Sequence, residues 1–268
     1  RQLEPKLLGR PTVNQSTLHR WRRMSDAGRV ARFIEVAPCY LGEVMFNSSN
    51  SGLIASQPVG PQLMRGGNVN RYQLIPQAKQ GEVVYLKHDE YRRQYAGDAR
   101  VNHFDAPRVA FQEAAPIDNW RRLIPAYMPA GRICGHTLRY FTTDAAYDLY
   151  AVLASFASAC CEWRFSLTST NNHVNAYEVD VLPIPRFERL RAAEPAKVPV
   201  DWERWDALFA DGSDGIVKWE RAVLAEMAAT PDQADVWPNS VHDALAAAGK
   251  EMSRLGEQRQ QLSSGFAR

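Results

Sequence analysis

The chain has 268 residues, of which 45% are hydrophobic and 23% charged. This is the composition of an ordinary globular protein, and it excludes a wholly disordered or collagen-like chain. No run of about 18 apolar residues is present, so we expect no transmembrane helix and no membrane partner. The N-terminal residues, RQLEPKLLGRP, contain neither a starting Met nor a signal-peptide core. They predict a chain cut from a longer or processed polypeptide.

The net charge of +2 hides two halves of opposite sign. Residues 1–140 hold 20 Lys and Arg against 11 Asp and Glu, a net charge of +9, whereas residues 141–268 hold 12 against 19, a net charge of −7. The basic half predicts a surface that faces a polyanion such as nucleic acid, with an uneven but solvated surface as the alternative. Four cysteines without a C-x-x-C pair favour reduced thiols in a core and a cytoplasmic location.

In chain order, the first two-thirds of the sequence predicts strands separated by polar loops. β-Branched and aromatic residues beside glycines and prolines indicate these strands. They cover residues 30–36, 81–87, 107–115 and 131–142. The prolines in residues 122–129 make that segment an edge strand or an irregular one. Residues 88–97 predict a short helix that ends at Gly97.

A longer helix is predicted over residues 144–165, with Asp144 as its N-cap. Two of its faces are apolar, so we expect it to be buried on both sides. In YEVDVL, apolar and acidic residues alternate strictly, which predicts a strand over residues 177–182. Pro183 and Pro185 would end that strand.

After residue 186 a linker-like stretch leads into helical patterns at 202–210, 216–229 and 240–262. The last pattern carries a heptad seam formed by Val241, Leu245, Ala248, Met252, Leu255 and Leu262. Such a seam more often packs on its own domain, and docking on a methyltransferase module or partner subunit is the alternative. Gly249 and Gly256 should weaken the helix by roughly 1 kcal/mol each relative to Ala.

These patterns together predict an α+β fold. A mixed, β-rich domain with a buried helix would span residues 1–186, and a helical extension for packing or partner docking would span residues 187–268.

Motifs that indicate catalysis are missing from the sequence. The six histidines lack metal-ligand spacing, and no G-x-S-x-G, P-loop or G-x-G-x-x-G string occurs. A site assembled from distant residues stays open as an alternative. We nevertheless expect no catalytic residue, metal site or cofactor site in this chain.

Two donor-rich loops supply the candidate binding residues. The first, residues 61–74, contains Arg65, Asn68, Asn70 and Arg71, and the second, residues 164–185, contains Asn171, Asn172, His173 and Asn175. Arg121 and Arg122 complete the candidate set. Arg and Asn side chains hold phosphates and also grip guanine and adenine edges. Polar loops that satisfy their own backbone are the alternative for both segments.

Several strings occur in a characteristic order: PQLMRGGNVNRY, PRVAFQE, RRLIPAYMPAG, GHTL, a helix, and LTSTNNHVNAYEVDVLPIP. Together they resemble the target recognition domain of adenine-specific DNA methyltransferases from restriction-modification systems. The tail WPNSVHDALAAAGKEM resembles the helical extension of the large single-chain enzymes. The family's Gly-rich S-adenosylmethionine loop and N-P-P-Y-type motif are absent from this sequence.

The resemblance implies recognition of double-stranded DNA for a methyltransferase or phage-defence enzyme, without catalysis by this chain. S-adenosylmethionine would bind a methyltransferase module, either another subunit or an upstream region. The Arg, Asn and His residues named above in the two loops, together with Arg121 and Arg122, would bind DNA. The alternatives are a DNA specificity subunit of a multisubunit restriction enzyme, a protein-interaction scaffold of a defence complex that uses the heptad seam, and an independent nuclease.

Overall fold

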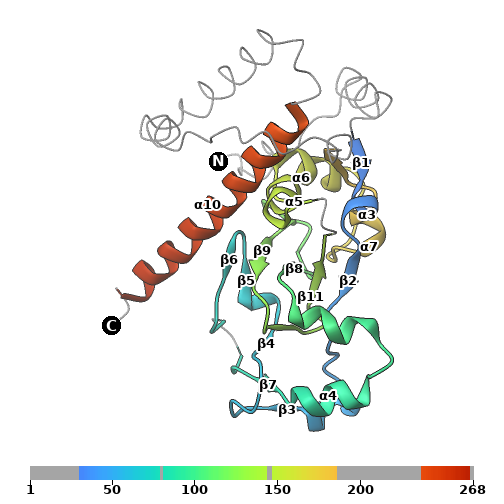
Figure 1. The fold of residues 1–268 in the computed structure, drawn as a ribbon, viewed down its shortest axis with the longest axis vertical. Coiled ribbons are helices and arrows are strands. Elements are labelled where there is room, and N and C mark those ends of the chain that lie inside the picture. Colours follow the sequence, from blue (N-terminus) through green and yellow to red (C-terminus); the bar gives the residue numbers. More distant parts are fainter. Residues whose placement is uncertain (1–29, 79–80, 144–146, 186–236, 266–268) are drawn as a thin grey trace, which may run out of the picture.

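The fold is α+β, as the sequence predicts, and its centre is a four-stranded antiparallel sheet (Figure 1). The computed structural model describes residues 30–78, 81–143, 147–185 and 237–265. The strands of the central sheet lie in the order β2 (Cys39–Leu41), β11 (Leu138–Phe141), β8 (Arg108–Gln112) and β9 (Pro125–Met128). The buried strand predicted at 107–115 is therefore confirmed as β8. The proline-containing segment lies at the sheet edge, where a missing backbone N–H is tolerated.

Smaller pieces of sheet and three 3₁₀ helices surround this centre. The two-stranded sheets pair β1 (Val30–Arg32) with β12 (Pro183–Pro185), β4 (Leu63–Met64) with β10 (Ile133–Cys134), β3 (Ile54–Ala55) with β7 (Tyr85–Leu86), and β5 (Val69–Asn70) with β6 (Gln73–Leu74). The 3₁₀ helices are η1 (Ser48–Leu53), η2 (Gly66–Asn68) and η3 (Ala99–Asp105).

Three of the predicted strands are shorter or broken in the structure. The segment 30–36 turns from β1 into a short helix, α3 (Phe33–Val36), and only β7 forms within 81–87. The segment 131–142 divides at Gly135 into β10 and β11. A Cβ atom on Gly135 would lie 2.6 Å from a ring carbon of Phe46 and 3.2 Å from the Met64 carbonyl oxygen, so a larger residue at this turn would have to displace the Phe46 ring. The turn sends β10 away from the central sheet to pair with β4.

The helix predicted over 144–165 is two helices, α5 (Leu149–Phe156) and α6 (Ala159–Ser166). Ser158 separates them because its hydroxyl accepts a hydrogen bond from the backbone N–H of Cys161 at 3.2 Å and caps α6. Asp148 caps α5, accepting from the Tyr150 N–H at 2.7 Å, whereas Asp144 lies outside the described residues. Burial of α5 on both sides is confirmed, since it packs on the sheet and on the C-terminal helix.

The strand predicted at 177–182 is wrong, because a short helix, α7 (Ala176–Val179), forms there instead. The Glu178 carboxylate turns back and accepts the backbone N–H of Asn175 at 3.1 Å, which stabilises a helix start. Tyr177 is 67% exposed while Val179 is buried, so the alternating residues do not share one face. Pro183–Pro185, expected to end a strand, form β12 themselves.

Two predicted helices are present, with ends that differ from the predicted ones. The short helix is α4 (His88–Gln94), which ends three residues before Gly97. The predicted helix at 240–262 lies within α10 (Trp237–Gly265), which runs across α5 and past β6 (Figure 1). The helical patterns at 202–210 and 216–229 fall outside the described residues. No helix in the described part of the chain is sufficiently long and apolar to cross a membrane.

The face on which α10 packs is not the predicted heptad seam. Met252 is 42% exposed, Leu255 43% and Leu262 66%, so the expectation of internal packing is wrong for these residues. Among the seam residues whose side chains are described, Leu245 packs against the core. Close contact occurs at the glycines instead. A Cβ atom added to Gly249 would lie 2.4 Å from the Tyr150 carbonyl oxygen, and one added to Gly256 would lie 2.6 Å from the Tyr72 carbonyl oxygen.

The thiols only partly follow the expected burial. Cys134 and Cys161 are buried and Cys39 is half-buried, but Cys160 is exposed at the start of α6. Its position beyond the turn at Ser158 explains the difference, because the predicted continuous helix would have kept Cys160 on an apolar face.

Candidate nucleic-acid interface

The first donor-rich loop attaches to the start of β9, and the second attaches to the connection 113–124 that leads from β8 into β9. On the side of the first loop, the Tyr72 N–H donates to the Pro125 carbonyl at 2.7 Å. On the side of the second loop, the Ala115 N–H donates to the Asn172 carbonyl at 2.9 Å, and the Val174 N–H donates to that of Glu113 at 2.7 Å. Segments far apart in the sequence are thus fixed to a common support.

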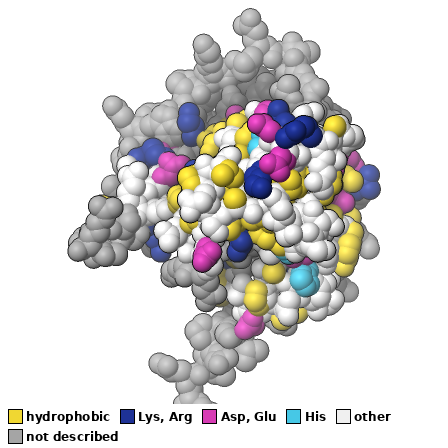
Figure 2. Space-filling view, turned by 90° about the horizontal axis from the view of Figure 1, so that it is seen from below, with side chains coloured by type: hydrophobic (Ala, Val, Ile, Leu, Met, Phe, Trp, Pro, Cys, Tyr) yellow, Lys and Arg dark blue, Asp and Glu magenta, His cyan; other side chains and the backbone are white. Residues whose placement is uncertain are grey.

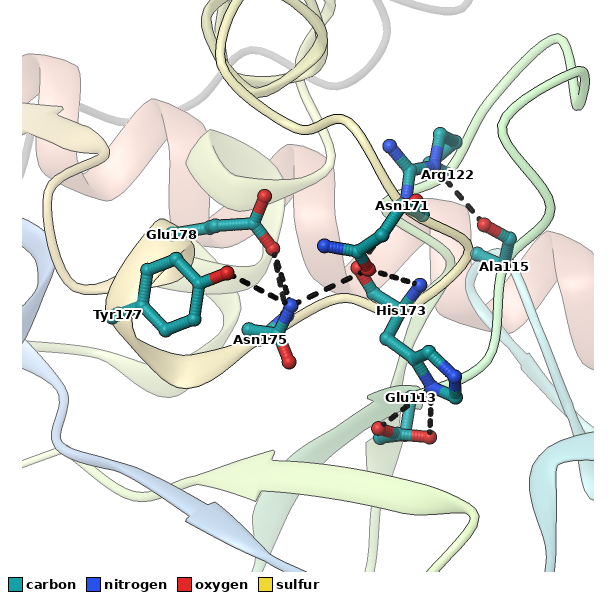
Figure 3. A network of polar contacts seen from close by, with 8 residues as sticks. All are labelled: Glu113, Ala115, Arg122, Asn171, His173, Asn175, Tyr177 and Glu178. Atoms are coloured by element: carbon teal, nitrogen blue, oxygen red, sulfur yellow. Dashed lines mark hydrogen bonds and ion pairs between the residues drawn. The ribbon is translucent and has the colours of Figure 1, made fainter.

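The second loop is shaped from within by its own amides (Figure 3). The side-chain oxygen of Asn171 accepts the His173 backbone N–H at 2.7 Å and the Asn175 amide at 3.4 Å. The Asn175 amide also donates to Glu178 at 2.9 Å. The side chains of these two asparagines therefore stabilise the loop itself. This agrees with the alternative given for the segment, a polar loop that satisfies its own backbone.

Arg122 is the internal tie between the connection and the second loop. Its side chain is buried and donates to the carbonyls of Asn171, His173 and Ala115, the last two at 3.2 and 3.0 Å (Figure 3). Burial lowers the pKa of this guanidinium, while the carboxylates of Glu178 and Glu162 oppose that shift. A side chain with this many internal acceptors has no surface left for DNA.

Two residues of the second loop keep donors at the surface. His173 is exposed, and its Nδ1 lies 3.0 and 3.1 Å from the two carboxylate oxygens of Glu113 (Figure 3). Asn172 is exposed too, and its Oδ1 accepts the Ile117 N–H at 2.9 Å. These contacts occupy His173 Nδ1 and Asn172 Oδ1, so the second ring nitrogen and the amide group are available for a ligand.

In the first loop, the Asn68 side chain stabilises the hairpin. It is buried, accepts the Arg65 backbone N–H at 2.8 Å and donates to the Ile75 carbonyl at 2.9 Å. The guanidinium of Arg65 lies over the Phe46 ring, 4.4 Å from its centroid. Both side chains are consequently held by contacts inside the fold.

Arg71 links the first loop to α5, and Asn70 faces outward. An Arg71 nitrogen donates to the Ala157 carbonyl at 2.7 Å, and its guanidinium lies 5.0 Å from the Tyr72 ring centroid. Tyr72 has a φ of 60°, a left-handed conformation uncommon outside glycine, that turns the chain between β5 and β6. Asn70 is exposed. Among the described residues its side chain makes one hydrogen bond, in which its oxygen accepts the Arg71 N–H at 2.9 Å.

Arg121 is a half-buried cation within electrostatic range of Arg71. Burial lowers the pKa of Arg121, and the Arg71 charge lowers it further, against the opposing charge of Glu162. Among the described residues its guanidinium has no hydrogen bond or ion pair with a carboxylate. Two neighbouring guanidinium groups repel each other, so a bound anion such as a phosphate would stabilise this arrangement.

The ten predicted residues therefore separate into two groups. Surface donors remain on Asn70, Arg121, Asn172 and His173. Internal contacts hold Arg65, Asn68, Arg71, Arg122, Asn171 and Asn175.

Sequence reasoning missed the exposed hydrophobic residues around these donors. Trp120 is 73% exposed, and Ile117 in the same connection is 44% exposed. The available signal was the polar string PIDNWRR between two strands, in which a tryptophan has no apolar neighbour pattern to explain it.

Sequence reasoning also missed a buried ion pair in the sheet. Arg108 and Glu43 are each 1% exposed, with 2.9 Å between a guanidinium nitrogen and a carboxylate oxygen. Glu43 also accepts the Cys134 N–H at 2.7 Å, and Arg108 lies over the Tyr140 ring. Burial raises the pKa of Glu43 to about 7 although Arg108 opposes the shift. Because both groups are enclosed, we assign this ion pair to the fold.

Charge on the described residues is mixed. Figure 2 views the end of the molecule that carries β3 and α4, and shows Lys and Arg beside Asp and Glu rather than in one basic field. Seven Lys and Arg and only two Asp and Glu of the basic half belong to residues 1–29, outside the described part. Local geometry, rather than net charge, therefore locates the candidate interface.

Comparison with family models and with curated proteins gives no match. No family model matches it, and no curated protein is significantly similar to it in sequence. Within the described residues, no group of three or more His, Cys, Asp or Glu side chains is placed to hold a metal ion.

Proposed function

We propose that this chain recognises double-stranded DNA for an adenine-specific methyltransferase or restriction-modification enzyme. The sequence resemblance supports this function. The structural support is the Arg121 guanidinium, which is within electrostatic range of Arg71 and makes no ion pair among the described residues. It lies on the connection 113–124, to which the second donor-rich loop is bonded. Phosphate contacts by such cations fix the register of a duplex, and amide and imidazole groups reach base edges.

In this proposal, DNA contacts come from Asn70, Arg121, Asn172 and His173. The chain supplies recognition in the cytoplasm, and a methyltransferase module, as a partner subunit or an upstream region, binds S-adenosylmethionine and performs the transfer. Arg65 and Arg71 contribute positive potential from their internal positions, since charge acts over several ångströms without direct contact.

Salt-dependent binding to duplex DNA tests this function. Arg121→Glu should weaken binding and lower the slope of log affinity against log salt by about 1 for each lost phosphate contact. Arg93→Glu, an equal charge change on the exposed side of α4, is the matched control and should change both quantities less. Absence of saturable duplex binding at low salt would refute the function, and equal effects of the two variants would refute the location.

A second function is favoured by α10. Met252, Leu255 and Leu262 present exposed apolar side chains along one helix. Such a stripe suits a scaffold that docks on another subunit of a defence complex. The DNA titration separates the two functions, because a scaffold without a DNA surface would show no slope that depends on Arg121.

A further inference from the structure

Trp120 is the most exposed of the large hydrophobic residues described, at 73%. An indole left in water forgoes a large favourable burial, because tryptophan offers one of the largest apolar surfaces of any side chain. Its neighbours in the string DNWRR are polar, so the sequence shows no apolar pattern that would bury the ring. The exposure therefore points to a ligand that covers the ring.

The loop that carries Trp120 is braced at both ends. Before it, the Asn119 N–H donates to the Pro116 carbonyl at 3.0 Å, and the Ile117 N–H donates to the Asn172 side chain at 2.9 Å. After it, the N–H groups of residues 122 and 123 both donate to the Glu162 carboxylate at 2.9 Å. A ring on a fixed loop binds with little loss of conformational entropy.

Residues of the same braced loop, and the loop bonded to it, indicate the kind of ligand. The residue after Trp120 is Arg121, whose guanidinium makes no ion pair among the described residues, and the Arg71 charge is close enough to lower the Arg121 pKa. Asn172, whose oxygen holds the loop, keeps its amide group for a ligand. An exposed aromatic residue next to such a cation is an arrangement that binds nucleic acid, with the base stacked on the ring and the phosphate held by the cation.

We propose that Trp120 stacks on an unstacked DNA base while Arg121 holds a neighbouring phosphate. This inference rests on the proposed function and adds the form of DNA that the surface prefers. Taking a base out of a duplex costs free energy, and the cost is least where the base is already unpaired. The chain should therefore bind a duplex with one unpaired adenine more tightly than the perfect duplex.

The test measures the affinity of the full 268-residue chain for two fluorescein-labelled duplexes by fluorescence anisotropy. One duplex is perfectly paired and the other contains a single bulged adenine. The expected preference for the bulged duplex is about tenfold, the size of one base–aromatic stacking contact. Trp120→Ala and Trp120→Leu should abolish that preference, and Trp120→Phe should keep most of it, because only Phe retains an aromatic face.

The outcomes separate this inference from the proposed function. If Trp120→Ala or Trp120→Leu keeps the preference, or if the unchanged chain shows none, stacking is refuted, while duplex binding that depends on Arg121 still supports DNA recognition. If neither duplex binds, both proposals fail. If Trp120→Ala binds both duplexes normally but loses assembly with a methyltransferase subunit, the ring belongs to a protein interface and the inference is overturned. Circular dichroism checks that each variant is folded.

Discussion

Removal of Arg108 should strongly destabilise the fold. In Arg108→Ala the Glu43 carboxylate, 1% exposed, keeps the Cys134 N–H at 2.7 Å but loses its only cation within 4 Å among the described residues. Removing one partner of a buried ion pair typically costs about 3–5 kcal/mol, because the other charge is left in a medium of low polarity. The lost guanidinium contact with the Tyr140 ring adds to that cost.

Urea unfolding followed by tryptophan fluorescence measures the change in unfolding free energy. The double variant Glu43→Leu with Arg108→Met is the matched control, since replacing both charges by apolar groups is often neutral or stabilising. It should recover most of the stability that Arg108→Ala loses. A loss of unfolding free energy below about 1 kcal/mol in Arg108→Ala would refute the reasoning, because an ordinary single substitution without a buried ion pair already costs about that much.

The loss in Arg108→Ala should also depend on pH. Burial raises the pKa of Glu43 from 4.5 to about 7 in the intact protein, so the folded state binds the proton more tightly than the unfolded state. The stability contribution of this group is then fully present below pH 4.5 and is lost as pH rises through about 7. Without Arg108 the folded pKa rises further, so the variant should be closest to the intact protein in acid and least stable above neutral pH.

The remaining predictions concern α10 and the second loop. Gly249→Val should lower stability by more than about 1 kcal/mol in urea unfolding because its side chain meets the Tyr150 carbonyl, whereas Met252→Asp on the exposed face should stay within about 0.5 kcal/mol. The opposite ranking would place the seam inside the fold. His173→Ala should lose DNA affinity but little thermal stability, since exposed ion pairs contribute about 0–1 kcal/mol; unchanged affinity would make His173 structural.

The sequence by itself determined the elements whose signal is local. The apolar run of β8, the prolines of β9 and the short helical segment of α4 with its stop signal at Gly97 each lie within a few consecutive residues. The same holds for the extent of α10 and for the two donor-rich loops. Backbone propensity and side-chain periodicity act over this range, so no distant contact was needed to predict these segments.

Tertiary contacts decided which side chains of those segments face inward. Arg122 is a polar residue in a polar segment, yet it is buried because the backbone carbonyls of Asn171 and His173, in the second loop, converge on it. Arg108 is buried because Glu43, far away in the sequence, reaches the same position in the sheet. The pattern of a single sequence does not show which distant residues will be in contact. The ten candidates could therefore not be divided from the sequence into residues that stabilise the loops and residues that keep donors at the surface.

The C-terminal helix shows the same division between local and distant causes. Its periodicity predicted a helix and an apolar seam, and the helix is present. Its packing face is set by Gly249 and Gly256, where the carbonyl oxygens of Tyr150 and Tyr72 leave no room for a Cβ atom. Glycine lowers helix propensity in an isolated segment but permits close backbone approach in a folded one. The sequence determined that this segment is a helix, and the shape of the surface beneath it decided which side is buried.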